Sequence, residues 1–474
     1  MGRVPTERAG RAGPGAVTGQ ATSRLLLPTL ALLTTITAVV SSLGAPLVPS
    51  IAAAYDVRLT TAQWSLTATL LTGAVATPIV GRFASGRLRR PTILVGLAVV
   101  TAGTAIAIVP TTYAVLVAGR AMQGVGMALL PLAIAVARDA LVGEPMNRAI
   151  ALLSVTTVAG AGLGYPLTAL VAELGGLSAA YALGTVLTGA TLLMAWRHLP
   201  GSAEAAPMRV DWAGAALLSV GMLAVLLAVS EGEVWGWTSP RTLGLGLGGA
   251  ALLVTWAFWT LRSPTPLVDL RMAVRPGIAA PNLVALVAGL GMYCLLTLSV
   301  VLVRADEPGF GLDMPVWVAG LILVPYSLMS VLGNQLARVV RVRLGAAPLL
   351  PTGCLMFLAS TVALALWHDH LWQLLLAMAL GGVGSGFTFS SLAVLMVPHL
   401  PQAETGSAMA FNQVLRYLGF TIGSATSVAL MAAYGGGSPG FRATLLTVSS
   451  LFVVAAVGAV LLDRAAPAPR VAPH

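Results

Sequence analysis

The most constraining feature of this chain is a series of long apolar stretches. Fourteen of them have about 20 residues or more, the length that an α-helix needs to cross a bilayer. They occupy residues 25–51, 62–81, 93–112, 113–137, 149–171, 177–196, 212–230, 242–261, 277–303, 315–335, 345–367, 372–397, 406–433 and 443–462. The stretches are continuous, whereas strands of a transmembrane barrel would alternate. We therefore predict an all-α polytopic membrane protein with fourteen spans.

The composition supports this class. Hydrophobic residues make up 57% of the 474 residues, charged residues only 9%, and the mean hydropathy is +0.90. A soluble domain usually has about 25% charged residues. This excludes a soluble enzyme, a nucleic-acid binder and a disordered regulator. Cys294 and Cys354 both lie in apolar stretches, so no disulfide framework is expected.

The distribution of arginine predicts the orientation in the membrane. All 26 basic residues are arginines, and 24 of them lie outside the spans. If the N-terminus is cytoplasmic, twenty of these lie on the cytoplasmic side and four on the outer side, namely Arg58, Arg241, Arg304 and Arg442. Arginine is enriched in cytoplasmic loops. We predict a multi-pass plasma-membrane protein with both termini in the cytoplasm, and we attribute the net charge of +10 to topology rather than to nucleic-acid binding.

Short glycine patterns recur between the two halves of the chain. The pairs are Gly81 with Gly333, Gly124-Val125-Gly126 with Gly382-Val383-Gly384, and Leu163-Gly164-Tyr165 with Leu418-Gly419-Phe420, at offsets of 252, 258 and 255 residues. A nearly constant offset indicates an internal repeat. We predict a disordered tail (1–23), a six-helix bundle (24–198), two inserted helices (199–263), a second six-helix bundle (264–462) and a short tail (463–474). Parallel repeats of this kind hold a substrate site at their interface.

Two motifs carry a family resemblance that covers residues 25–462. The segment Leu116-Val117-Ala118-Gly119-Arg120-Ala121-Met122-Gln123-Gly124-Val125-Gly126 is similar to the fourth-span motif of the major facilitator superfamily. The segment Gly160-Ala161-Gly162-Leu163-Gly164-Tyr165-Pro166 resembles the fifth-span motif of its fourteen-span drug:proton antiporter branch, the multidrug efflux type. The resemblance implies a major facilitator fold, and it implies that Arg120 and Gln123 couple proton movement to substrate exchange.

The chain departs from this family at two acidic positions. Ser85 stands where the loop after the second span usually has Asp, and Val40 stands where the first span of this branch usually has an acid. Asp139 is a candidate replacement for the loop Asp, and a solvated loop charge is the alternative. Glu173 is a candidate access site for protons at the outer end of the fifth span.

Two charges lie well inside the predicted spans, Arg120 and Arg416. An arginine at the centre of a membrane helix costs roughly 3 kcal/mol, so it should face a cavity, a partner or water. Arg120 lies seven residues from the outer end of its span, at a depth of roughly 10 Å. The alternative to a coupling role is a structural arginine bonded to backbone carbonyls of a kinked neighbour.

The remaining candidate residues fall into two groups. The gating group combines motif glycines, a proline and loop charges; it comprises Gly81, Arg87, Arg89, Arg90, Asp139, Gly124, Gly126, Gly160, Gly164 and Pro166. The cavity group combines aromatic and polar residues of inner spans; it comprises Tyr165, Asn282, Tyr293, Tyr326, Phe387, Phe411, Asn412 and Arg416. Helix packing is the alternative role for both groups.

These features favour a secondary exporter of small apolar or amphipathic compounds, driven by proton exchange. The alternative is an uptake or facilitated transporter of the same fold. The spans contain no clustered catalytic residues and no GxxxxGK[ST] loop, so neither an intramembrane enzyme nor an ATP-driven pump is expected. We expect no cofactor, no metal and no nucleic-acid partner, and a monomer in the lipid bilayer that handles a small molecule and protons. Because the intramembrane charges are both positive, we predict neutral or anionic substrates.

Overall fold

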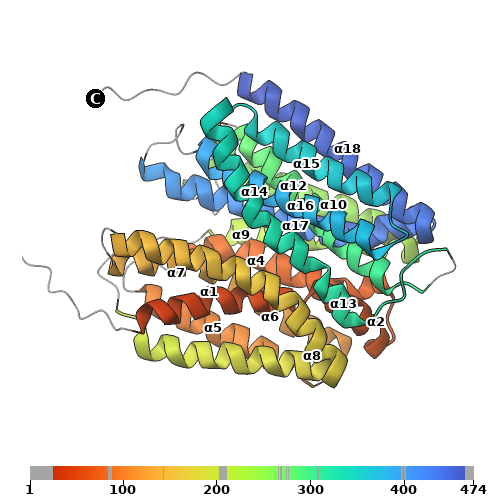
Figure 1. Cartoon of the computed structure of the whole chain (residues 1–474), viewed down its shortest axis with the longest axis horizontal. Helices are drawn as coiled ribbons and strands as arrows, with labels where there is room; N and C mark the ends of the chain where they lie inside the picture. The colour runs from red at the N-terminus through yellow and green to blue at the C-terminus, as the bar shows by residue number, and fades with distance from the viewer. Residues whose placement is uncertain are drawn as a thin grey trace, which may run out of the picture.

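A computed structural model describes residues 25–464, except 84–87, 110, 142–143, 202–210, 265, 267–269, 274, 276, 307–308, 397–398 and 400–401. The predicted tails lie outside the described residues, apart from Asp463 and Arg464, which continue the last helix. Ser85 and Arg87 also lie outside them. The described chain is almost entirely helical, and its helices form two bundles stacked on each other (Figure 1).

The N-terminal half forms the N bundle, which lies below the other in Figure 1. Its elements are α1 (Leu26–Ser42), η1 (Ala45–Leu47), α2 (Val48–Tyr55), α3 (Leu59–Ala62), α4 (Trp64–Phe83), α5 (Arg89–Ile106), α6 (Tyr113–Gly124), η3 (Val125–Ala128), α7 (Leu129–Ala140) and α8 (Glu144–His198). The long α8 holds both the fifth and the sixth predicted span. Gly176 has non-helical dihedrals there (φ 73°), which marks the turn between them.

The C-terminal half forms the C bundle, preceded by two inserted helices. The inserted pair is α9 (Trp212–Trp235) and α10 (Pro240–Arg262), and the short α11 (Leu270–Ala273) follows. The C bundle comprises α12 (Ala279–Arg304), α13 (Val316–Leu321), α14 (Leu323–Leu344), α15 (Leu349–Leu366), α16 (Leu371–Met396), α17 (Gln402–Ala433) and α18 (Gly437–Arg464).

The predicted architecture of fourteen spans is confirmed. In the described part of the chain, ten helical stretches are long and apolar enough to cross a membrane by length and composition. The other four predicted spans correspond to α1 with η1 and α2, to α4, to α5 and to the first part of α8. Several spans predicted as continuous are broken. The fourth narrows to a 3₁₀ turn next to Gly124, and the second begins with a separate turn that ends at Gln63.

The inserted helices form a hairpin beside the interface of the two bundles. Asp211 caps α9, because its carboxylate accepts the N–H of Gly214 at 2.8 Å. The same oxygen accepts the indole N–H of Trp259 at 3.0 Å and so ties α10 to α9. Helix α9 contacts α4 and α17, one helix from each bundle. The insert therefore flanks the bundle interface without separating the bundles.

The internal repeat is visible in the helix packing. A Cβ atom added to Gly124 of α6 would lie 2.2 Å from the carbonyl oxygen of Thr69 in α4. A Cβ atom added to Gly382 of α16 would lie 2.2 Å from the carbonyl oxygen of Tyr326 in α14. Both contacts bring two helices to backbone distance, which only glycine allows. The two bundles thus use the same packing at equivalent positions.

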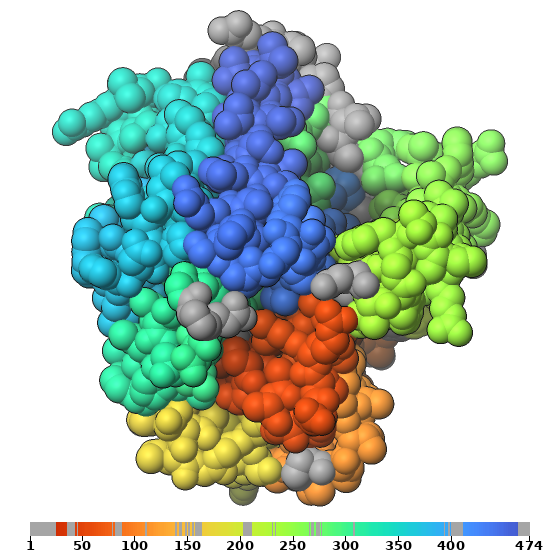
Figure 2. All heavy atoms as spheres, turned by 90° about the vertical axis from the view of Figure 1, so that its right-hand side faces the viewer, coloured from red at the N-terminus to blue at the C-terminus, as the bar shows by residue number. Residues whose placement is uncertain are grey.

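The molecule has two distinct ends. The Gly176 end is named for the turn of α8 at Gly176, and α2 and α13 are labelled at this end, on the right of Figure 1. The arginine-rich end is the opposite one, where α5 begins with Arg89 and α14 ends near Arg341. Figure 2 looks onto the Gly176 end, where the segment around α2, in red, fills the space between the bundles.

Candidate functional site

Arg120 is fully buried in α6 and is bonded to its own helix and to a neighbour. Its Nε donates to the carbonyl oxygen of Ser65 in α4 at 3.1 Å, and its Nη1 donates to the Oε1 of Gln123. The hydroxyl of Thr69 donates to the carbonyl oxygen of Arg120 at 2.9 Å. Gln123 also donates through Nε2 to the carbonyl oxygen of Gly103 in α5 at 3.4 Å. Arg120 and Gln123 therefore tie together α4, α5 and α6.

The remaining nitrogen of Arg120, Nη2, has no hydrogen-bond partner among the described residues. Tyr181 and Tyr293 interact electrostatically with Arg120, and neither is a carboxylate. The hydroxyls of Tyr181 and Ser65 are buried and also have no partner in the described protein. Around Arg120, then, several buried polar atoms have unused hydrogen-bonding capacity.

The bond to Ser65 is the contact that a structural arginine would make. Ser65 lies in the first turn of α4, two residues after Gln63, and the guanidinium that bonds to its carbonyl ties α6 to this turn. The partnerless Nη2 is not explained by that role, because leaving a buried donor unmet costs about 1–3 kcal/mol or more. The geometry thus supports a structural contact together with a donor that is available for another group.

A polar bridge joins the two bundles next to Arg120. Nε2 of Gln63 donates to the hydroxyl of Ser424 in α17 at 2.9 Å and to that of Thr297 in α12 at 3.3 Å. The hydroxyl of Thr67, one turn along α4, lies 3.1 Å from the same Ser424 hydroxyl. All four side chains are at most 3% exposed. The bridge closes the bundle interface in the half toward the Gly176 end.

A second set of contacts closes the interface at the Gly176 end itself. The Oε2 of Glu173 in α8 accepts the N–H of Val316, the first residue of α13, at 3.0 Å. Nearby, a Cβ atom added to Gly320 would lie 2.6 Å from the carbonyl oxygen of Tyr165. The hydrogen bonds that Gln63, Thr67 and Glu173 make between the bundles all lie in this half.

Arg416 of α17 lies against aromatic rings of the C bundle. Its Cζ is 5.0 Å from the ring centroid of Phe389 and 5.8 Å from that of Tyr417, within the range of cation–π contact. The ring of Phe420 is 4.7 Å from Tyr293 and 5.7 Å from Tyr417. The Nε of Arg416 is buried and has no hydrogen-bond partner in the described chain. We call these five residues the aromatic–arginine cluster.

The aromatic–arginine cluster adjoins the bundle interface. Tyr293, Tyr417 and Phe420 share one buried apolar cluster with Leu66 and Leu70 of α4. The charge of Arg416 therefore lies close to the interface between the bundles.

The other predicted cavity residues do not all join the cluster. Asn412 donates to Asn282 at 3.0 Å, so these two amides pair inside the C bundle. Phe387 is fully buried against Ala337 and Leu349, away from the interface. Further predicted residues belong to the buried core: Phe411 in the interface cluster, and Tyr165 and Tyr326 in the neighbouring one.

The predicted gating residues lie on several helices of the N bundle. Gly124 and Gly126 are buried in the fourth span, where Gly124 meets α4. Gly164 is buried and Pro166 lies inside α8, whose course stays helical at both. The other positions are Gly81 in α4, Asp139 in α7, Gly160 in α8, and Arg89 and Arg90 at the start of α5. The surroundings of Gly81, Asp139 and Gly160 lie outside the described residues.

No metal site is found in the described part of the chain, where no three His, Cys, Asp or Glu side chains cluster. His368, in the turn between α15 and α16, contacts neighbouring protein groups. The Nε2 of His368 lies 3.0 Å from the hydroxyl of Ser438, and its ring is 5.1 Å from that of Phe441. Burial lowers the pKa of His368, so its neutral form is favoured in this turn.

Sequence reasoning missed the residues of the polar bridge. Gln63, Thr67, Thr297 and Ser424 carry no motif, and serine and threonine are common in membrane helices. The one available signal was Gln63 itself, an amide at the start of a span and next to Trp64.

The comparisons with known proteins agree with this architecture. The model of the Major Facilitator Superfamily matches residues 30–366 and 281–474. "Multidrug resistance protein 3" of Bacillus subtilis (strain 168) is 24% identical over 351 residues, which are 73% of this chain and 67% of that protein. "Cephamycin export protein CmcT" of Amycolatopsis lactamdurans is 27% identical over 412 residues, which are 82% of this chain and 81% of that protein.

A solved structure shows the same fold. The crystal structure of an auto-inhibited POT-family peptide transporter aligns with a TM-score of 0.65 and 14% identity, covering 95% of this chain and 99% of that one. With the family model spanning nearly the whole described chain, the conclusion is direct: this chain belongs to the Major Facilitator Superfamily.

Proposed function

We propose that this protein, a membrane transporter of small molecules by its family, exports apolar or amphipathic compounds such as a drug or natural product. Protons move in exchange, and the two bundles rock about the substrate to give alternating access. The relatives named above are a multidrug resistance protein and a cephamycin exporter, which supports export over uptake.

The observation that carries the proposal is the link between Arg120 and the polar bridge. Arg120 bonds to Ser65, and Gln63, two residues earlier on the same segment, bonds to Ser424 of the other bundle. A group that binds at the free Nη2 of Arg120 would shift this segment and strain the bridge. Substrate binding between the bundles would then weaken the contacts that close the Gly176 end, as an exporter requires.

Glu173 is proposed as part of the same closure. Its carboxylate accepts the Val316 N–H across the bundle interface in a charge-assisted bond. Breaking this bond should therefore favour opening of the Gly176 end.

The proposed orientation places the arginine-rich end in the cytoplasm, together with both termini. A cysteine at Ala433, which is exposed at the end of α17, should react with a membrane-impermeant maleimide added to intact cells. A cysteine at Ala346, exposed between α14 and α15, should react only after permeabilisation. The native Cys294 and Cys354 are buried and serve as the unreactive background. The reverse labelling pattern would overturn the orientation.

Transport in inside-out vesicles tests the function. With an acidic lumen, we expect uptake of amphipathic compounds that stops when the pH gradient is collapsed, and measurable alkalinisation of the lumen when substrate is added. Accumulation in right-side-out vesicles instead, or transport that ignores the pH gradient, would favour the uptake or facilitated alternative.

A further inference from the structure

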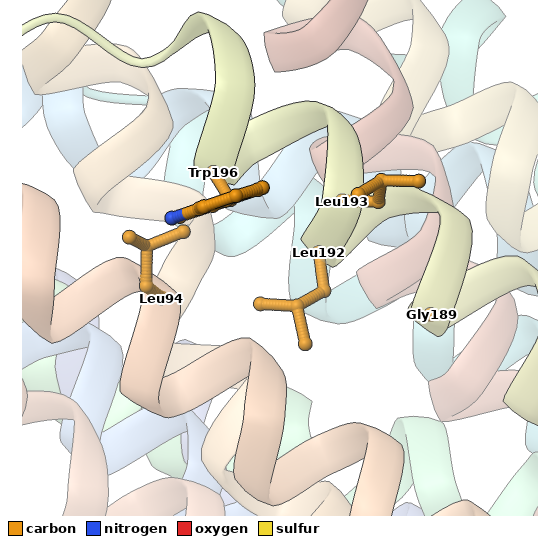
Figure 3. Close-up of a pocket in the computed structure, with 5 residues that line it drawn as sticks. All are labelled: Leu94, Gly189, Leu192, Leu193 and Trp196. Carbon is orange, nitrogen blue, oxygen red and sulfur yellow. The ribbon is translucent and has the colours of Figure 1, made fainter.

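One hollow in the described structure lies far from the bundle interface, on the outer surface of the N bundle. It has a volume of about 350 Å³ and is lined by Leu94 of α5 and by Gly189, Leu192, Leu193 and Trp196 of α8. Figure 3 shows the Trp196 ring over Leu94, with Leu192 beside them and Leu193 pointing away from Leu94. Leu193 is 55% exposed and Trp196 is 60% exposed, as expected of side chains that face lipid. We call this hollow the α5–α8 groove.

Three arginines, Arg89, Arg90 and Arg197, lie near the α5–α8 groove on the side of the arginine-rich end. Nη2 of Arg90 donates to the carbonyl oxygen of Trp196 at 2.7 Å, which fixes the guanidinium at the mouth of the groove. Arg90 lies one helical turn before Leu94, Arg89 precedes it, and Arg197 follows Trp196 and is exposed. The Nε of Arg90 is buried and has no hydrogen-bond partner in the described chain. Cationic donors thus stand at one end of an entirely apolar hollow.

Close packing between helices does not require a glycine at position 189 in the groove. A Cβ atom added at Gly189 would meet only Cγ2 of Thr101 at 3.8 Å, an ordinary contact. At Gly103 of α5, by contrast, a Cβ atom would lie 2.5 Å from the carbonyl oxygen of Gly119. The backbone therefore tolerates a side chain at position 189, and the side chain that glycine lacks is what leaves the hollow open.

We propose that the α5–α8 groove binds an anionic phospholipid. One acyl chain occupies the apolar hollow, and the phosphate is held by Arg89, Arg90 and Arg197. The dimensions fit, because Gly189 lies seven residues, roughly 10 Å, from Trp196 along the helix. That distance places the hollow in the outer part of one leaflet's acyl region, directly below a headgroup at the arginines. Basic pockets between membrane helices recognise such headgroups. In the proposed orientation the lipid belongs to the cytoplasmic leaflet.

Native mass spectrometry of the full chain tests the proposal, with phosphatidylglycerol and phosphatidylcholine of identical acyl chains as probes. We expect bound phosphatidylglycerol on the wild-type chain at concentrations where phosphatidylcholine is absent. The combined variant Arg89→Gln, Arg90→Gln, Arg197→Gln should bind at least about tenfold more weakly, since each basic side chain near an anionic surface contributes roughly fivefold. Inorganic phosphate should not compete; if it does, the site recognises phosphate alone and the lipid proposal is wrong.

Two matched controls localise the effect. The combined variant Arg338→Gln, Arg341→Gln, Arg343→Gln removes the same charge from exposed positions of α14 at the same end, and it should bind lipid as the wild type does. Gly189→Leu fills the groove without a charge change and should weaken binding, whereas Gly248→Leu on α10, where a Cβ meets nothing within 4 Å, should not.

Gly189→Leu also keeps the test decisive if the arginine variant fails to fold. Crosslinking by phosphatidylglycerol with a photoreactive acyl chain should label the segment from Gly189 to Arg197. Labelling spread evenly over the lipid-facing helices would overturn the proposal. So would equal lipid loss in the α14 control, or a change of oligomeric state, rather than of lipid binding, in Gly189→Leu.

Discussion

The Arg120→Ala variant is expected to reach the membrane in normal amounts and to lose coupled transport. The substitution removes the bond to the Ser65 carbonyl and the donor Nη2, while the neighbouring bridge from Gln63 to Ser424 can persist. Hydrogen bonds to a charged group are worth about 1.5–3 kcal/mol, so we expect transport to fall by roughly 10- to 150-fold. The measurement is pH-driven uptake into inside-out vesicles, normalised to the amount of folded protein.

Arg120→Lys should fail almost as completely. A single ammonium group lacks the planar fork with which the guanidinium reaches Ser65 and Gln123 at the same time. Arg341→Ala, an exposed arginine of α14, is the matched control and should transport normally. Full transport by Arg120→Ala would show that this arginine serves only the structure. Loss of folded protein in Arg120→Ala, with normal transport per folded molecule, would lead to the same conclusion.

The architecture was largely predictable from the sequence, and the reason is physical. A membrane helix must satisfy its own backbone hydrogen bonds and remain apolar, so the number of spans can be read along the chain. The inserted pair and the repeat followed from counting and from spaced glycines. The irregularities did not follow: Gly176 turns the chain inside an apolar stretch, and Gln63, which separates α3 from α4, bonds to the other bundle.

The site was predictable only in part, because orientation about a helix axis is a tertiary property. Arg120 and Arg416 could be singled out because a charge inside a span needs a partner. Phe387 and Phe389 differ by two positions, or about 200° around a helix. The first packs into the C bundle while the second lies under Arg416. The pairing of Asn282 with Asn412 likewise depends on how α12 and α17 meet. Composition alone does not distinguish these cases.

Substrate charge is the second property for which a large effect is expected. A cation in a medium of low dielectric constant needs an opposite charge nearby. The charge in the aromatic–arginine cluster is the guanidinium of Arg416, which lies over the ring of Phe389. The Nε of Arg416 has no hydrogen-bond partner among the described residues. Arg120 adds a second positive charge with an unused donor. We therefore expect neutral and anionic amphiphiles to be transported and dicationic dyes to be excluded.

The Arg416→Gln variant separates the charge from the shape of the cluster. Glutamine keeps a polar side chain but removes the cation and its contacts with Phe389 and Tyr417. Transport of an acidic compound should fall by roughly tenfold or more, because a charged hydrogen bond is worth at least about 1.5 kcal/mol. Transport of a neutral compound of equal lipophilicity should change much less.

Gln413→Leu is the matched control: it removes a polar neighbour whose amide bonds to Tyr417, and it should leave the ratio of acidic to neutral transport unchanged. Resistance assays with the same pair of compounds and a dicationic dye give the decisive comparison. Strong, selective resistance to the dicationic dye would contradict the electrostatic argument, and an equal loss of both compounds in Arg416→Gln would show that this arginine acts through packing rather than charge.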